Sequence, residues 1–152
     1  MGKQKKRAPI PGKPREGKPI ALPPEGRLPG AGNSHERVCW RFTHADRDGR
    51  WGIDKITTEA WCEIVDRLAQ LESMTVQELK QAKIYIEYEL PGKLLSEAVN
   101  RLLDVGLGDQ TKVGRLRVTK QKRLYGIIEG NVFHAIWWDP SHEIYPWEPP
   151  NT

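Results

Sequence analysis

Side chains suited to phosphodiester chemistry are concentrated in the last third of the chain. Arginine and lysine stabilise the extra negative charge that develops on phosphorus in the transition state, and histidine or tyrosine can transfer protons. The candidate catalytic residues are Arg123, His134, His142 and Tyr145. The candidate RNA-binding residues are the other cations of the acid-free stretch 112–123, namely Lys112, Arg115, Arg117, Lys120 and Lys122.

The same residues are suited to binding RNA, or an acidic protein, without any reaction. Cationic side chains on edge strands also prevent sheet-to-sheet aggregation, which is a purely structural alternative. The residue types therefore leave open whether the chain is an enzyme. An endoribonuclease is the activity that they would suit.

No metal or cofactor site is predicted. His134 and His142 are eight positions apart with Asp139 nearby, but this spacing fits no common zinc pattern and no thiolate cluster accompanies it. Asp46 and Asp48 stand before a glycine as in part of a calcium loop, yet the remaining ligands of such a loop are missing. That stretch predicts a turn. The sequence contains neither a phosphate-binding loop nor a dinucleotide-binding fingerprint.

A β-hairpin over residues 123–139 is expected to position most of the candidate residues. Two apolar runs rich in β-branched and aromatic residues flank Gly130-Asn131. This dipeptide predicts a two-residue turn, because glycine accepts the positive φ that such a turn needs. A loop at this point places Ile127 opposite His134 and, further along, Arg123 opposite Trp138.

Alternation of side chains divides the hairpin into two faces. One face is apolar and is predicted to join the core: Leu124, Ile128, Phe133 and Trp137. The other face carries Arg123, Tyr125 and His134, so any chemistry is expected there. On that face the guanidinium of Arg123 could stack on Trp138 and still reach a phosphate.

The rest of the body predicts a mixture of strands and helices. Residues 37–43 alternate like a strand, and residues 57–72 carry apolar side chains at helical spacing after a threonine N-cap. Thr75 and Glu78 form a capping-box pattern for a short helix ending near Ala82. Residues 84–90 are ambiguous but alternate like a strand, and residues 95–105 predict a helix that ends before Gly106.

We therefore expect one α+β domain over residues 35–147. Its small antiparallel sheet is formed by the C-terminal strands and the 37–43 strand. The helices over 57–72 and 95–105 are predicted to pack on one face of this sheet, the face that bears Trp137. Three of the six tryptophans, Trp40, Trp61 and Trp137, fall on stripes expected to be buried.

Charge is distributed unevenly along the 152 residues. The net charge is +4, but residues 1–32 hold eight Lys/Arg against two acids, so the remainder holds 16 basic and 18 acidic side chains. Residues 1–34 are rich in proline and glycine and predict a disordered basic leader, and residues 148–152 predict a flexible tail. No run approaches the roughly 20 apolar residues of a membrane span. Cys39 and Cys62 are expected to be reduced, buried thiols in a cytoplasmic protein.

The order of these elements resembles the RelE/ParE toxin superfamily. A first strand, helices, and a basic strand leading into an antiparallel hairpin are followed by a short tail with a tyrosine. The local similarity lies in RLYGIIEGNVFHAIWWDPSHEIYP, within a resemblance covering about residues 37–147. By position, Arg123 corresponds to the family's strand arginine, Tyr145 to its tail tyrosine, and Arg115 and Arg117 to basic residues of the preceding strand.

The resemblance implies an mRNA endonuclease, ribosome-associated or free, or a gyrase poison, neutralised by a small antitoxin protein. RNA or the ribosome and an antitoxin are thus the expected partners. The chain departs from the family in its basic leader, an extra segment before the sheet, and a body that is near neutral. The alternatives are a non-catalytic interaction or regulatory protein of a toxin–antitoxin or phage-related locus, and a structural domain without a ligand.

Overall fold

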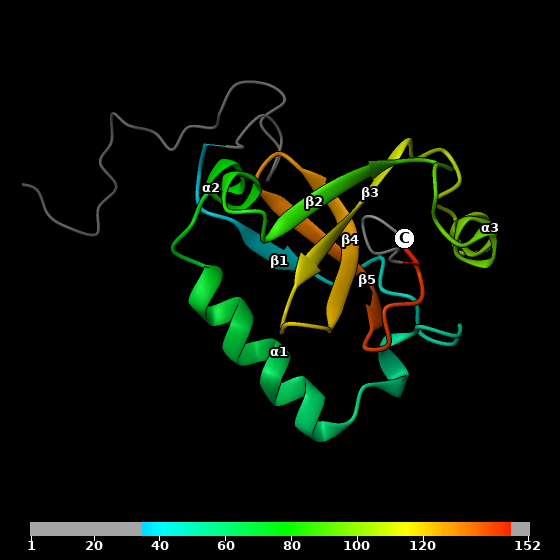
Figure 1. Ribbon diagram of the computed structural model, residues 1–152, viewed down its shortest axis with the longest axis horizontal. Helices are drawn as coiled ribbons and strands as arrows, with labels where there is room; N and C mark the ends of the chain where they lie inside the picture. The colour runs from blue at the N-terminus through cyan, green and yellow to red at the C-terminus, as the bar shows by residue number, and fades with distance from the viewer. Residues whose placement is uncertain (1–34, 147–152) are drawn as a thin grey trace, which may run out of the picture.

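The computed structural model describes residues 35–146 (Figure 1). The predicted leader, residues 1–34, and the predicted tail, residues 148–152, lie outside the described residues. Among the helices that are described, none has the length and apolar character needed to cross a membrane.

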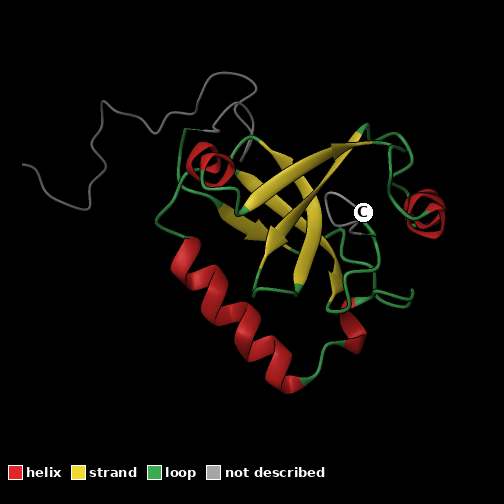
Figure 2. Cartoon of the chain, in the orientation of Figure 1, coloured by secondary structure: helices red, strands yellow, loops and turns green. Residues whose placement is uncertain are grey.

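The described chain forms an α+β fold around a five-stranded sheet (Figure 2), which confirms the predicted fold class. The strand order is β1-β5-β4-β3-β2, with β1 parallel to β5 and every other neighbouring pair antiparallel. The segment 84–90, whose pattern was ambiguous, contains strand β2 at the edge of the sheet. The strands are β1 (Cys39–Arg41), β2 (Tyr85–Glu89), β3 (Lys112–Arg117), β4 (Arg123–Glu129) and β5 (Val132–Asp139).

The helices begin and end close to where the sequence signals predict. They are α1 (Thr58–Leu71), α2 (Val76–Gln81) and α3 (Ser96–Asp104), with a short 3-10 turn, η1 (Ile53–Lys55), before α1. The Thr57 side chain accepts a hydrogen bond from the Ala60 amide, and Thr75 and Glu78 form the expected capping box at α2. Gly106 follows α3 with a φ of +83°, a conformation that glycine adopts without strain.

Helices cover both faces of the sheet, so the prediction that they share one face is wrong. α1 and α2 pack on a core that includes Leu116, Leu124 and Phe133. α3 packs on a second core with Tyr125 and Trp137. In Figure 1, α1 and α3 lie on opposite sides of the strands. Strand β2, which lies between α2 and α3 in the sequence, forms the edge of the sheet. The chain passes around this edge, so α3 packs on the face opposite to α1 and α2.

The hairpin register is correct near its turn and wrong beyond it. Gly130 has a φ of +64°, and Ile127 pairs with His134 as predicted. Between Tyr125 and Gly126 the register shifts, because β5 carries one extra residue in a β-bulge. Past the bulge, Arg123 pairs with Asp139 instead of Trp138.

The bulge also moves the hairpin tryptophans between faces, because a shift of one residue reverses the side of the sheet that a side chain occupies. Trp137 is fully buried, as predicted, but in the α3 core, whereas Trp138 joins the α1 core. Trp40 and Trp61 are only partly buried against the α1 core. Both cysteines are free but exposed, so the prediction of buried thiols is wrong.

Candidate functional site

A cavity of about 740 Å³ opens at the end of the sheet where β3 ends and β4 begins. We call it the arginine pocket. Its walls come from the two strands, the loop that joins them, and the segment that follows β5. The lining residues are Arg115, Lys120, Gln121, Arg123, Pro140, Ser141 and His142.

Arg123 forms the deep wall of the pocket and is only 7% exposed. One η nitrogen donates to the carbonyl oxygens of Thr119 (2.8 Å) and Lys122 (3.2 Å), which fixes the β3–β4 loop. Its ε nitrogen is buried without a hydrogen-bond partner in the described part of the chain. Burial, with Arg115 and Arg117 nearby, lowers the pKa of this guanidinium. The sequence predicts a partly exposed arginine stacked on Trp138. In the structure the arginine is buried, and its neighbour across the β-ladder is Asp139.

Arg115 stands beside Arg123 in the pocket. It pairs with Tyr125 across the β3–β4 ladder, and one of its η nitrogens is also buried without a partner among residues 35–146. Its guanidinium carbon lies 5.7 Å from the ring centroid of Tyr88 and 6.0 Å from that of Tyr145. These two rings stack at 4.1 Å with an interplanar angle of 14°. The predicted site tyrosine therefore holds an arginine against an aromatic pair.

The segment after β5 folds over the arginines and is anchored at both ends. Buried Asp139 accepts hydrogen bonds from the amides of Glu143 (2.8 Å) and Ile144 (2.9 Å). The Ile144 carbonyl in turn accepts one from the Leu95 amide, at the start of α3 (2.8 Å). The Asp139 carboxylate accepts these amide hydrogen bonds, and the described residues include no ion pair between it and Arg123, its cross-strand neighbour.

His142 is the turn residue of this segment, with a φ of +64°. Burial lowers its pKa, and the positive charges of Arg123 and Arg115 lower it further. The imidazole is therefore neutral at pH 7. Asp139 and the Tyr145 backbone act in the opposite direction but are outweighed, and the buried δ nitrogen makes no well-formed hydrogen bond within the described residues. A neutral imidazole beside two arginines has the properties of a proton acceptor next to an anion site.

Tyr125 belongs to the predicted chemistry face but was not among the candidate site residues. It is the cross-strand neighbour of Arg115 and does not itself line the pocket. Its hydroxyl is buried and makes no well-formed hydrogen bond within the described residues. Burial raises its pKa, with Asp139 and Tyr88 adding to the effect and the neighbouring Arg115 opposing it. The hydroxyl thus stays protonated. Its position two residues after Arg123 in the same strand was the available signal, because such residues share a face.

His134 is not brought to the arginine pocket. It lines a separate cavity of about 240 Å³ together with His44, and the two imidazole centroids are 5.5 Å apart. Its ε nitrogen lies 3.6 Å from a carboxylate oxygen of Glu129, and burial lowers its pKa. His134 is close to the turn end of β5, whereas the arginine pocket is at the other end.

The predicted RNA-binding residues also divide by position. Lys120 lines the pocket, and Arg117 is exposed directly opposite Arg123 in the ladder. Lys122 forms an ion pair with Glu63 of α1 (2.9 Å). Lys112 lies at the far end of β3, paired with Glu89 of β2, and is not part of this surface.

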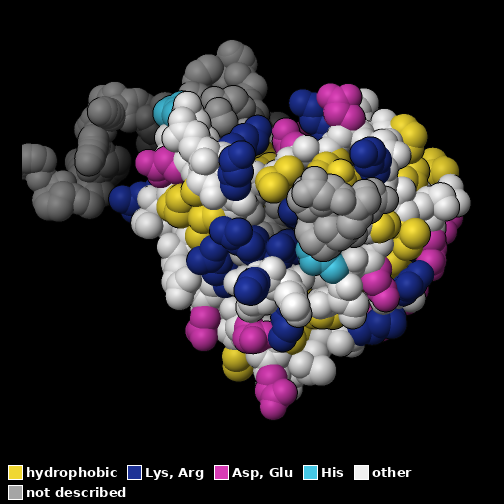
Figure 3. Space-filling model, in the orientation of Figure 1, with side chains coloured by type: hydrophobic (Ala, Val, Ile, Leu, Met, Phe, Trp, Pro, Cys, Tyr) yellow, Lys and Arg dark blue, Asp and Glu magenta, His cyan; other side chains and the backbone are white. Residues whose placement is uncertain are grey.

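Within residues 35–146, no ion pair neutralises the arginines of the pocket. None of the ion pairs among the described residues involves Arg115, Arg117 or Arg123. Figure 3 shows Lys and Arg side chains gathered in the middle of one face, next to histidine atoms. Unpaired guanidinium groups in a partly desolvated pocket attract an anion strongly.

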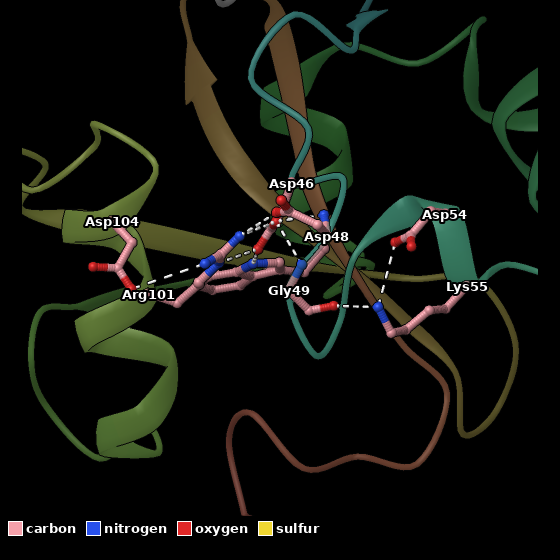
Figure 4. A network of polar contacts seen from close by, with 8 residues as sticks. Asp46, Asp48, Gly49, Asp54, Lys55, Arg101 and Asp104 are labelled. Carbon is pink, nitrogen blue, oxygen red and sulfur yellow. Dashed lines mark hydrogen bonds and ion pairs between the residues drawn. The ribbon is translucent and has the colours of Figure 1, made fainter.

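A polar network outside the pocket lining connects α3 to β5 (Figure 4). Buried Asp46 accepts two hydrogen bonds from Arg101 of α3, both at 2.8 Å, and one from the Trp137 indole at 2.9 Å. It also accepts amide hydrogen bonds within its own loop, as the predicted turn requires. Burial opposes the charge, but Arg101 and Trp137 outweigh it and lower the pKa of Asp46 to about 2.

Neither a metal cluster within residues 35–146 nor a known relative of the chain identifies the site. No group of three or more His, Cys, Asp or Glu side chains in the described ranges is arranged to hold a metal ion. No family model, curated protein or solved structure matches this chain.

Proposed function

We propose that this protein is a RelE-like toxin of a toxin–antitoxin system that binds RNA in the arginine pocket and cleaves it. The observation that carries the proposal is the pair of buried guanidinium nitrogens, on Arg115 and Arg123, that lack any partner among residues 35–146. A buried donor without an acceptor costs about 1–3 kcal/mol. Phosphate oxygens would satisfy both donors through charge-assisted hydrogen bonds.

The proposed reaction uses a proton acceptor, a proton donor and two cations at the pocket. In the proposed reaction, neutral His142 accepts the proton of a ribose 2′-hydroxyl, whose oxygen attacks the neighbouring phosphorus. The bond from phosphorus to the 5′ oxygen breaks, leaving a 2′,3′-cyclic phosphate. Protonated Tyr125, or Tyr145 as the sequence predicts, supplies the proton to the departing oxygen. Arg115 and Arg123 stabilise the charge on the non-bridging oxygens.

The order of elements supports the RelE-like assignment. A first strand, helices and a basic strand precede the hairpin, and Arg123 opens the first strand of that hairpin. A small antitoxin protein and either RNA or the ribosome are the proposed partners. Growth arrest on induced expression, relieved by an adjacent antitoxin reading frame, is the expected cellular outcome.

A non-catalytic interaction protein of a toxin–antitoxin or phage-related locus is the second candidate. One observation favours it: the hydrogen bonds from Arg123 to Thr119 and Lys122 give this arginine a structural role without any ligand.

The test is RNA cleavage by the purified full-length chain, with and without ribosomes. Arg123→Lys keeps the charge but loses the planar fork, so it is expected to reduce cleavage nearly as much as Arg123→Ala. Arg47→Ala, which removes an exposed arginine outside the pocket, is the matched control and should cleave normally. Full activity in Arg123→Ala with an unchanged melting curve would exclude the pocket. Binding without cleavage would favour the second candidate.

A further inference from the structure

Helix α1 places an arginine, Arg67, at the end of β3, one of the two strands that line the arginine pocket. The ε nitrogen of Arg67 donates to the carbonyl oxygen of Arg117, the last residue of β3, at 3.2 Å. One η nitrogen donates to the amide oxygen of Gln70 at 3.3 Å. Among the ion pairs of the described residues, none involves Arg67. The guanidinium is thus held in place by neutral groups, and no carboxylate offsets its charge.

Arg67 extends a row of arginines that begins inside the pocket. Arg115 and Arg117 are two residues apart on β3 and share a face, and Arg117 is directly opposite Arg123. Like charges opposite each other in a ladder destabilise a sheet. Burial is the main cause of the lowered pKa values of Arg123 and Arg67. Repulsion from neighbouring arginines, Arg117 in both cases, lowers them further.

Acidic side chains nearby do not relieve this repulsion. Glu63 of α1, which is within reach of the β3–β4 loop, is paired with Lys122 at 2.9 Å. Among the described residues, the row of four arginines therefore continues from the pocket to α1 without a carboxylate partner. A single phosphate in the pocket would neutralise only one end of this row.

We propose that Arg67 and Arg117 form a second phosphate subsite, so that the ligand is a single-stranded polynucleotide running from the pocket toward α1. This inference rests on the proposed binding of a phosphate by Arg115 and Arg123. A mononucleotide would fill the pocket alone, whereas a longer strand would place a further phosphate at Arg67. A single strand fits better than a duplex, because the pocket arginines are recessed and a flexible strand can present one phosphate at a time.

The experiment measures how the affinity of the full-length protein depends on ligand length. The probes are uridine 3′-monophosphate and a 2′-O-methyl uridine tetranucleotide, which lacks the attacking hydroxyl and is not cleaved. In the unmodified protein we expect the tetranucleotide to bind much more tightly than the mononucleotide. Arg67→Ala should lose about tenfold in tetranucleotide affinity and leave mononucleotide affinity unchanged.

Two further variants separate charge from structure. Arg67→Lys retains the charge and should keep most of the tetranucleotide affinity, whereas Arg47→Ala should bind both probes normally. The eight cations of residues 1–32 are common to all variants, so their contribution cancels in each comparison. Because Arg67→Ala removes one phosphate-binding cation, the slope of log affinity against log salt should fall by about 0.7 in this variant.

Equal tetranucleotide affinity in Arg67→Ala and the unmodified protein would overturn the second subsite. Mononucleotide binding that still depends on Arg123 would leave the proposed function standing in that case. Tighter binding of a blunt RNA duplex than of the tetranucleotide would overturn the single-stranded assignment. Failure of both probes to bind would overturn the proposed function and the second subsite together.

Discussion

Replacing Asp46 with asparagine removes the carboxylate that joins α3 to strand β5. The side chain of Asp46 is fully buried, and its oxygens accept two hydrogen bonds from Arg101 and one from the Trp137 indole. Asparagine offers one acceptor oxygen and turns an NH₂ group toward these donors. Arg101 would then lose its principal partner, because its remaining contacts are to the exposed side chains of Asp48 and Asp104.

The loss of stability in Asp46→Asn can be estimated in two ways. A pKa lowered from 3.8 to about 2 corresponds to about 2 kcal/mol in favour of the charged form in the folded state. Breaking a buried ion pair by removing one partner costs about 3–5 kcal/mol. Arg101 is 26% exposed and is partly rehydrated when the partner is removed, so the lower value applies. We expect Asp46→Asn to lower the free energy of unfolding by about 2–3 kcal/mol at pH 7.

Urea denaturation over a range of pH provides the assay. Because the folded pKa of Asp46 is below the unfolded value, its contribution is complete above about pH 5 and is lost as the pH falls from 3.8 toward 2. The difference between Asp46→Asn and the unmodified protein should shrink over that interval. Asp48→Asn is the control: its side chain is 86% exposed, and its loss should cost less than about 1 kcal/mol. A pH-independent difference, or equal effects of the two variants, would refute this reasoning.

Three other substitutions test the hairpin and the pocket. Gly126→Ala should lower the melting temperature by several degrees, because a Cβ there would collide with the Phe133 ring and the His134 carbonyl; circular dichroism melts would measure this. Tyr125→Phe removes an unpartnered buried hydroxyl, so stability should be unchanged or slightly higher, and RNA cleavage should fall only if that hydroxyl donates a proton. His142 has a lowered pKa, so the pH–rate profile should rise with pH and level off below 6.5, and His142→Gln should abolish this limb.

Local signals in the sequence were sufficient for the helices and the hairpin turn. Capping patterns at Thr57 and Thr75 and the glycine of the Gly130-Asn131 turn act within a few residues, so no tertiary information was needed. The β-bulge was not predictable in this way. After His134, residues 135–138 are uniformly apolar, so no polar residue marks where the alternation is interrupted. The wrong predictions for the face of Trp137 and for the cross-strand partner of Arg123 both follow from the one extra residue of the bulge.

The candidate site was predicted in its residue types more than in its arrangement. Arg115, Arg123, His142 and Tyr145 meet because the β3–β4 ladder and the folded-back segment after β5 converge at one end of the sheet. His134 was grouped with them because the predicted register put it on the same hairpin face as Arg123, but it lies near the turn, at the other end of the sheet. Arg67 gave no signal, since its position depends on how α1 crosses the end of β3.

Titration of the His142 ring by NMR tests the central claim, that the arginine pocket binds an RNA phosphate, most directly. The chain contains four histidines, so the loss of one signal in His142→Gln identifies the resonance. Positive charge from Arg123 and Arg115 helps to lower the pKa of His142, and a bound phosphate would offset that charge. We predict that the uncleavable tetranucleotide raises the pKa of His142 and leaves that of His134 unchanged. An unaltered His142 titration at saturating tetranucleotide would contradict the claim.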